Sequence, residues 1–269
     1  MSMYPKQFWN EFRIVDFPKK IFVGMWFDKK NVEKRYYRII EKAIHKTELE
    51  PLFLKDLVTG DSIPIDIMKG IIECKLVLFD ISPMSKIFKN RNPNVMYEVG
   101  LAHTWRNKEE VILIADDVKS LPFDIQTIGI VQYNPNDDNA IDTIANTIEF
   151  RLQEIERIFS AKVIKAYTSL TIDAFNMLMG SKGQVFTITE KDVIENKNPT
   201  LYLDALSLLL NLGLIEFLTD AKMDGTGGYG YHPTELGRAV IKYYGFPLLE
   251  DNLKEKYPSL HKKKYGISD

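Results

Sequence analysis

Hydrophobic residues in the first half of the chain gather in short, uninterrupted runs. Each run is bounded by polar or turn-forming residues, which is the pattern of a buried strand. Because the runs do not alternate with polar residues, they indicate strands covered on both faces, as in a parallel sheet. The five runs are residues 21–27, 50–54, 76–81, 111–115 and 129–133.

Between these runs, apolar residues recur at helical spacing. The clearest case is residues 32–47, and similar patterns cover residues 66–74, 94–106 and 140–159. Strands that alternate with helices predict an α/β fold with a doubly wound, five-stranded parallel sheet. Such sheets bind ligands at the carboxyl ends of their strands. The helical positions expected to be buried in the first of these segments are Val32, Tyr36, Ile39, Ile40, Ala43 and Ile44.

The second half of the chain shows a different order of elements. Helices are expected at residues 162–179, after Thr189, at 200–212 and at 234–244, with Thr189 and Thr234 as amino-terminal caps and Gly213 ending the third helix. Strands are expected at residues 184–188, 214–219 and 229–232, the last two as a hairpin. This order, with "LLNLGLIEF … YGYHPTELGRAVI", resembles the winged-helix family.

The predicted organisation is therefore an α/β domain at residues 16–158, a smaller winged-helix domain at 159–247, and a polar tail at 248–269. Hydrophobic residues make up 45% of the chain, which excludes a disordered protein. The net charge of −2 argues against a protein held to nucleic acid mainly through phosphates. Residues 198–212 contain no Lys or Arg, so nucleic-acid binding is weakly supported and a role in a homo-oligomer or larger complex is favoured.

Other features concern the compartment. Cys74 is the single cysteine, which excludes an intrachain disulfide and indicates a buried thiol. No apolar stretch approaches the ~20 residues that a membrane span needs, and the first residues lack the apolar core of a secretory signal. We therefore expect a cytoplasmic protein without membrane contact.

One constellation carries candidate chemistry. Asp80 ends the third strand, and Pro93 and Asn94 precede a helix in which Asn94 is expected to be the cap. Glu98 lies one turn further and leans back towards the start of the helix, where the helix dipole favours an ionised carboxylate. Gly100 is expected to allow close packing on the sheet. A carboxylate beside a sugar suits cleavage of an N-glycosidic bond, because it stabilises or attacks the oxocarbenium-like centre.

The motifs "IFVGMWFD", "LVLFDIS", "NPNVMYEVGLAH", "VILIADD", "LPFDIQ" and "GIVQYN" resemble, in order and spacing, the prokaryotic TIR-like relatives of nucleoside 2-deoxyribosyltransferases over about residues 20–150. The resemblance implies that Glu98 is the catalytic carboxylate and that Asp80 and Asn94 contact the sugar. It implies deoxynucleosides, nucleoside monophosphates or NAD as substrates. It also implies an effector role in bacterial anti-phage defence, including retron systems that join such a domain to a winged helix.

The chain departs from the deoxyribosyltransferases before the catalytic helix. It has Asn-Pro-Asn-Val where those enzymes have a small-residue Asp-Ser-Gly-Thr-like stretch. Hydrolysis of a nucleotide or NAD, or transfer from a nucleotide, therefore fits better than base exchange between nucleosides. A nucleotide-sensing module that does not cleave its ligand, and whose winged helix contacts DNA or a protein partner, is the alternative.

The remaining candidate residues are expected to bind substrate rather than to react. Met25, Trp26 and Phe27 follow the first strand and line either the nucleotide pocket or the core. Arg91 is either a phosphate ligand or a solvated loop residue, and Ser82 lies just beyond Asp80. Asp116, Asp117 and Asp124 lack a metal-ligand pattern and are interpreted as turn or cap residues, so neither a metal nor a cofactor is expected.

Overall fold

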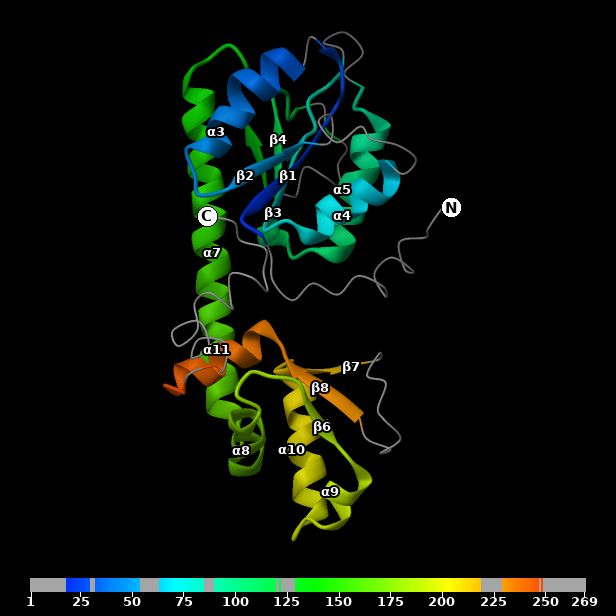
Figure 1. Cartoon of the computed structure of the whole chain (residues 1–269). Coiled ribbons are helices and arrows are strands. Elements are labelled where there is room, and N and C mark those ends of the chain that lie inside the picture. The colour runs from blue at the N-terminus through cyan, green and yellow to red at the C-terminus, as the bar shows by residue number, and fades with distance from the viewer. Residues whose placement is uncertain are drawn as a thin grey trace, which may run out of the picture. The chain divides into compact units, whose positions relative to one another are not determined.

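The structure, a computed structural model, describes residues 18–29, 32–53, 63–84, 90–119, 121, 129–218, 229–246 and 248 (Figure 1). The chain divides into two compact units, Met1–Glu156 and Arg157–Asp269. The sequence places the domain boundary at residues 158 and 159. Helix α7 (Asn139–Ser169) passes from one unit into the other.

The first unit is built on a five-stranded parallel sheet. Its strands are β1 (Lys20–Met25), β2 (Glu50–Phe53), β3 (Leu76–Asp80), β4 (Val111–Ala115) and β5 (Ile130–Gln132), in the order β2-β1-β3-β4-β5. Neighbouring strands run parallel throughout. The predicted doubly wound parallel sheet is confirmed.

Helices cover both faces of this sheet (Figure 1). One core cluster joins Ile21 and Val23 to residues of η1 (Val32–Ile40), a π-helical segment, and of α3 (Glu41–His45) and α7. A second cluster joins Phe22 and Phe79 to residues of α4 (Ile63–Glu73) and α5 (Pro93–Trp105). Successive strand residues thus point to opposite faces. The short 3-10 helix η3 (Lys108–Glu110) precedes β4. The six helical positions predicted to be buried between residues 32 and 44 are all buried.

The start of α5 differs from the prediction. Its cap is Asn92, whose Oδ1 accepts hydrogen bonds from the backbone amides of Asn94 and Val95 at 2.9 and 3.2 Å. Pro93 is the first helical residue, a position that suits proline because no N–H is needed there. The expectation that Asn94 is the cap was therefore wrong. The cap lies on the other side of the proline.

Helix α7 is longer than expected. It continues through residues 159–162, where the sequence predicts a break, because this stretch contains neither Gly nor Pro. The break comes at residues 170–171, and Thr171 caps α8 (Ile172–Gly180) by accepting a hydrogen bond from the Ala174 amide. The single helix predicted at residues 162–179 is thus two helices.

The second unit contains a small antiparallel sheet in the order β6-β8-β7, and its elements follow the predicted order. The caps formed by Thr189 and Thr234 are confirmed, and Gly213 ends α10 with a φ of +66°. The winged-helix assignment remains a prediction. The elements after α8 are β6 (Phe186–Ile188), α9 (Glu190–Ile194), α10 (Pro199–Asn211), β7 (Ile215–Leu218), β8 (Tyr229–Pro233) and α11 (Glu235–Tyr243).

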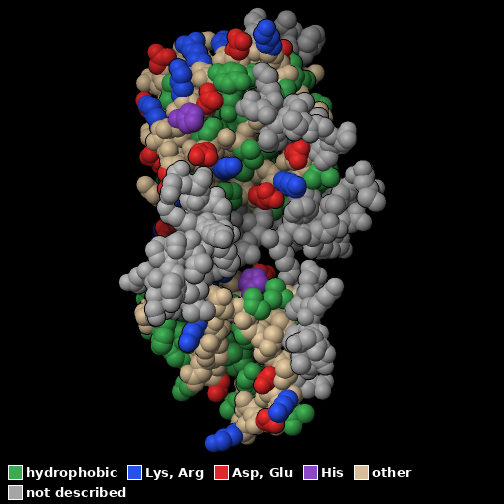
Figure 2. All heavy atoms as spheres, viewed as in Figure 1, with side chains coloured by type: hydrophobic (Ala, Val, Ile, Leu, Met, Phe, Trp, Pro, Cys, Tyr) green, Lys and Arg blue, Asp and Glu red, His purple; other side chains and the backbone are tan. Residues whose placement is uncertain are grey.

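Figure 2 shows one face of the molecule, with the described side chains coloured by type. On the described part of the face in Figure 2, acidic and basic side chains are intermingled. Helix α10 carries neither Lys nor Arg, and its Leu201 and Leu203 remain about half exposed. Binding to nucleic acid and assembly into an oligomer both stay predictions.

Candidate functional site

Glu98 lies where a doubly wound sheet of this order binds its ligands. The winding reverses between β1 and β3, and the crevice outside the carboxyl ends of these two strands is the usual ligand site. Helix α5 packs against both strands. A Cβ atom added to Gly24, near the end of β1, would lie 2.9 Å from Glu98 Oε2. The carboxyl group therefore rests directly on the β1 backbone.

Burial controls the charge of Glu98. The residue is 8% exposed, and no hydrogen bond or ion pair reaches its carboxyl group from the described residues. Desolvation raises its pKa to about 7. The helix dipole, expected to keep the group ionised, acts mainly within the first turn, and Glu98 is the sixth residue of α5. At neutral pH the carboxyl group is about half protonated, which is the range in which proton-transfer groups work best.

Because Glu98 packs against β1, any side chain at position 24 is expected to lower the stability of the fold. In Gly24→Ala the new methyl group would overlap the ring of Phe79 and lie 2.9 Å from Glu98 Oε2. We expect a loss of about 1–3 kcal/mol in the free energy of unfolding, measured by urea denaturation.

The matched control for this prediction is Gly100→Ala. Gly100 lies within α5, and a Cβ atom there would meet nothing within 4 Å, so its expected close packing on the sheet was wrong. Alanine at this exposed helical position should stabilise the protein by about 0.8–1 kcal/mol. A Gly24→Ala variant as stable as the wild type would contradict the close contact.

Asp80 is held on the other face of the sheet. Phe79 belongs to the core cluster beneath α5, and the next residue, Asp80, points to the opposite side. Its Oδ2 accepts a hydrogen bond from Tyr133 Oη at 2.7 Å, and its Oδ1 accepts one from the Ser82 amide at 2.9 Å. Asp80 and Glu98 therefore lie on opposite faces of the sheet, with no hydrogen bond between them. A direct contact of Asp80 with substrate stays a prediction.

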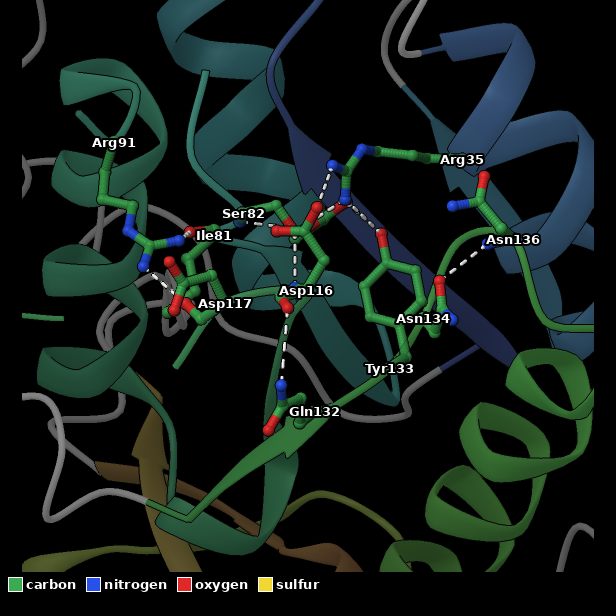
Figure 3. A network of polar contacts seen from close by, with 11 residues as sticks. Arg35, Ile81, Ser82, Arg91, Asp116, Asp117, Gln132, Tyr133, Asn134 and Asn136 are labelled. Atoms are coloured by element: carbon green, nitrogen blue, oxygen red, sulfur yellow. Dashed lines mark hydrogen bonds and ion pairs between the residues drawn. The ribbon is translucent and has the colours of Figure 1, made fainter. Parts of the chain in front are cut away.

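Arg35 from η1 organises the polar network around Asp80 (Figure 3). Its Nη1 donates to Ser82 Oγ and Tyr133 Oη at 2.7 and 2.8 Å and lies 3.5 Å from Asp80 Oδ2. Its Nη2 donates to Asp116 Oδ2 at 2.6 Å. Ser82 Oγ also accepts a hydrogen bond from the Asp116 amide. Hydrogen bonds and ion pairs thus connect η1 with the residues at the ends of β3, β4 and β5, at the carboxyl-terminal edge of the sheet.

The ionisation of this network follows from its burial. Burial alone lowers the pKa of Arg35, but the charge of Asp80 and the hydrogen bond to Asp116 outweigh it, and the net shift is upward. Burial, reinforced by Asp80, raises the pKa of Tyr133 well above its usual value. Arg35 is therefore permanently charged and Tyr133 permanently neutral near pH 7. Neither residue was predicted from the sequence.

Arg91 and Asn94 take different places. Arg91 donates to the backbone carbonyls of Ile81 and Asp117, both at 2.6 Å, and so joins the segments that follow β3 and β4. Asn94 is exposed at the second position of α5. A phosphate contact of Arg91 and a sugar contact of Asn94 remain predictions.

The three residues at the end of β1 separate into core and surface. Met25 is 3% exposed and belongs to the core cluster beneath η1 and α7. Trp26 is half-buried, whereas Phe27 is 52% exposed with its ring centre 5.2 Å from that of Phe53. Phe27 therefore offers an aromatic surface near the carboxyl end of β2.

A cavity of about 710 Å³ opens at the carboxyl ends of β4 and β5. Glu98 does not line it. Asp116 and Asp117, predicted as turn residues, do, and Asp124 lies outside the described residues. The described lining residues are Pro83, Asp116, Asp117, Gln132, Tyr133, Asn134, Pro135 and Asn136.

The described residues offer neither a cluster of metal ligands nor a membrane-spanning helix. They contain no group of three or more His, Cys, Asp or Glu placed to hold a metal ion. None of the described helices is both long and apolar enough to cross a membrane.

Comparison with known proteins leaves the family open. No family model matches the chain, and no curated protein matches it. Among solved structures, the chain is similar to a 2-desoxiribosyltransferase from Leishmania mexicana, with 21% sequence identity and a TM-score of 0.31. The match covers 37% of this chain and 66% of the transferase, just under two thirds of its length. At this TM-score the similarity carries no argument about function.

Proposed function

We propose that the first unit cleaves the N-glycosidic bond of a nucleotide or of NAD, with Glu98 as the catalytic carboxyl group. The observation that carries the proposal is the buried Glu98 carboxyl against Gly24 at the junction of β1 and β3. The motifs of residues 20–150, through their resemblance to the deoxyribosyltransferase relatives, also imply that Glu98 is the catalytic carboxyl group.

The chemistry needs one well-placed carboxylate. The bond from C1′ of the sugar to the base nitrogen breaks, both bonding electrons leave with the base, and positive charge develops on the sugar. Ionised Glu98 stabilises that charge or bonds to C1′ until water adds there, and the proton released by the water ends on the base or in solvent. In a desolvated site this charge stabilisation is much stronger than in water.

The other candidate residues have supporting roles in the proposal. Asn94, at the exposed amino end of α5, and Phe27, beyond β1, are assigned to the sugar and the base. Asp80 is assigned to ordering the neighbouring strand ends through Arg35 and Tyr133. Following the sequence resemblance, the second unit is assigned to holding the enzyme in an oligomer or complex of an anti-phage effector.

The test is release of free base by the full-length protein. NAD, deoxynucleosides and nucleoside monophosphates are incubated separately with the wild type and with Glu98→Gln, and products are separated by chromatography. We expect base release from a nucleotide or NAD by the wild type alone. Equal release by both proteins would refute the proposal. Tight binding measured by calorimetry, without any product, would establish the nucleotide-sensing alternative instead.

A further inference from the structure

The cavity at the carboxyl ends of β4 and β5 is lined by none of Glu98, Asn94 and Phe27, the residues assigned above to the reacting sugar and base. Pro83 follows β3, Asp116 and Asp117 follow β4, and Gln132 ends β5. Its volume of about 710 Å³ lies within the range of small-molecule sites. All the lining residues that the structure describes belong to the first unit.

The hydrogen-bonding character of the lining is specific. Gln132, Asn134 and Asn136 carry amides, each of which both donates and accepts. In Asp116, Oδ2 is held by Arg35, whereas Oδ1 is buried and has no hydrogen-bond partner. A buried carboxylate oxygen without a donor is costly, so Asp116 contributes an unsatisfied acceptor next to the cavity rather than an exposed one.

The charge of the lining argues against phosphate. The two aspartates are negative, and none of the lining residues that the structure describes is positive. A phosphate placed here would meet the carboxylate of Asp117, and none of the described lining residues is an arginine or lysine that could bind it. Pro83 and Pro135 add apolar surface, against which the C–H face of a sugar ring can pack.

From these observations we propose that the cavity binds an uncharged, hydroxyl-rich ligand of sugar to nucleoside size. Vicinal hydroxyls donate to the carboxylate of Asp117 and exchange hydrogen bonds with the amides of Gln132, Asn134 and Asn136. Because Asp116 and Tyr133 both bond to Arg35, which faces Asp80, occupancy of the cavity is coupled to the network in Figure 3.

The experiment measures binding, so it does not depend on the proposed catalysis. Full-length Glu98→Gln protein is titrated with ribose, adenosine, AMP and spermidine by calorimetry and ligand-observed NMR. Ribose and adenosine should bind, and AMP should bind no more tightly than adenosine. In a background that also carries Gln132→Ala and Asn136→Ala, adenosine binding should weaken about tenfold, as expected when two modest hydrogen bonds are lost.

The matched control is Asn146→Ala, which removes an exposed amide from α7 outside the cavity. It should leave adenosine binding unchanged, and the melting temperature of every variant confirms that it folds. Three results would overturn the proposal: no binding of ribose or adenosine, adenosine binding that the two cavity substitutions do not weaken, or a clear preference for spermidine or AMP. If the assay of the proposed function detects no base release, these three binding results can still be measured and interpreted, so the two proposals can fail separately.

Discussion

Glu98→Gln is expected to release base about 10²–10⁴ times more slowly than the wild type, the usual range when a proton-transfer or charge-stabilising side chain is removed. Glutamine keeps the size of the side chain but cannot become an anion. Because the pKa of Glu98 is about 7, the wild-type rate should rise with the ionised fraction from pH 5 through pH 7 and level off above about pH 8. Initial rates across this pH range, with a substrate that is stable there, give both results.

The same substitution is expected to stabilise the fold above pH 7. The pKa of Glu98 rises from 4.5 in the unfolded chain to about 7 in the folded protein, so between these values the folded state binds more protons. The stabilisation linked to Glu98 is therefore fully present below pH 4.5 and is lost as the pH rises through 7. At 1.36 kcal/mol per pKa unit, Glu98→Gln should gain about 3 kcal/mol at pH 8 relative to the wild type.

Urea denaturation at pH 4.5 and pH 8 measures this difference. The control is Glu149→Gln, which replaces an exposed glutamate on α7 and should shift neither stability nor rate. A Glu98→Gln variant that loses activity without gaining stability at pH 8 would show that the carboxyl is well solvated. A Glu98→Gln variant that gains stability but keeps full activity would show that Glu98 is buried as described but takes no part in catalysis.

The fold was predictable because the strands of the first unit are buried on both faces. The runs around β1, β3 and β4 contain few polar residues, and helical spacing between them predicts a doubly wound sheet. The cap of α5 was missed by two residues, since Asn92 and Asn94 flank Pro93 and asparagine is a good cap at either position. The proline settles the choice, because it fills the first helical position.

The candidate site was only half predictable. The order of the motifs identifies Glu98 as a candidate. It does not show on which face of the sheet Asp80 lies, because the residues before it are apolar on both faces of the strand. Arg35 lies on the apolar side of η1, between Val32 and Tyr36. The helical spacing of the apolar residues could therefore have predicted that Arg35 is buried. Its partners come from loops distant in sequence, and no local pattern joins Arg35 to Tyr133.

Arg35→Ala should destabilise the first unit by about 3–5 kcal/mol, as expected when one member of a buried charge network is removed. The arginine side chain is 10% exposed, and its loss removes the positive charge that lies 3.5 Å from Asp80, whose side chain is 2% exposed. Asp116 loses its ion pair at the same time. Urea denaturation of the full-length protein at pH 7 measures the change, with the signal of the first unit followed through its own transition.

Two further variants separate charge from packing. Arg38→Ala, from the same segment, breaks an exposed pair with Asp138 at 3.8 Å and should cost no more than about 1 kcal/mol. When Asp80→Asn is added to Arg35→Ala, the buried carboxylate charge left without Arg35 is removed, and the amide oxygen still accepts the hydrogen bond from Tyr133. The double variant should therefore recover part of the lost free energy of unfolding. If Asp80→Asn recovers nothing, the arginine stabilises the sheet edge by packing and hydrogen bonding. The electrostatic coupling between Arg35 and Asp80 is then absent, and the link from the cavity to Asp80 must run through Tyr133.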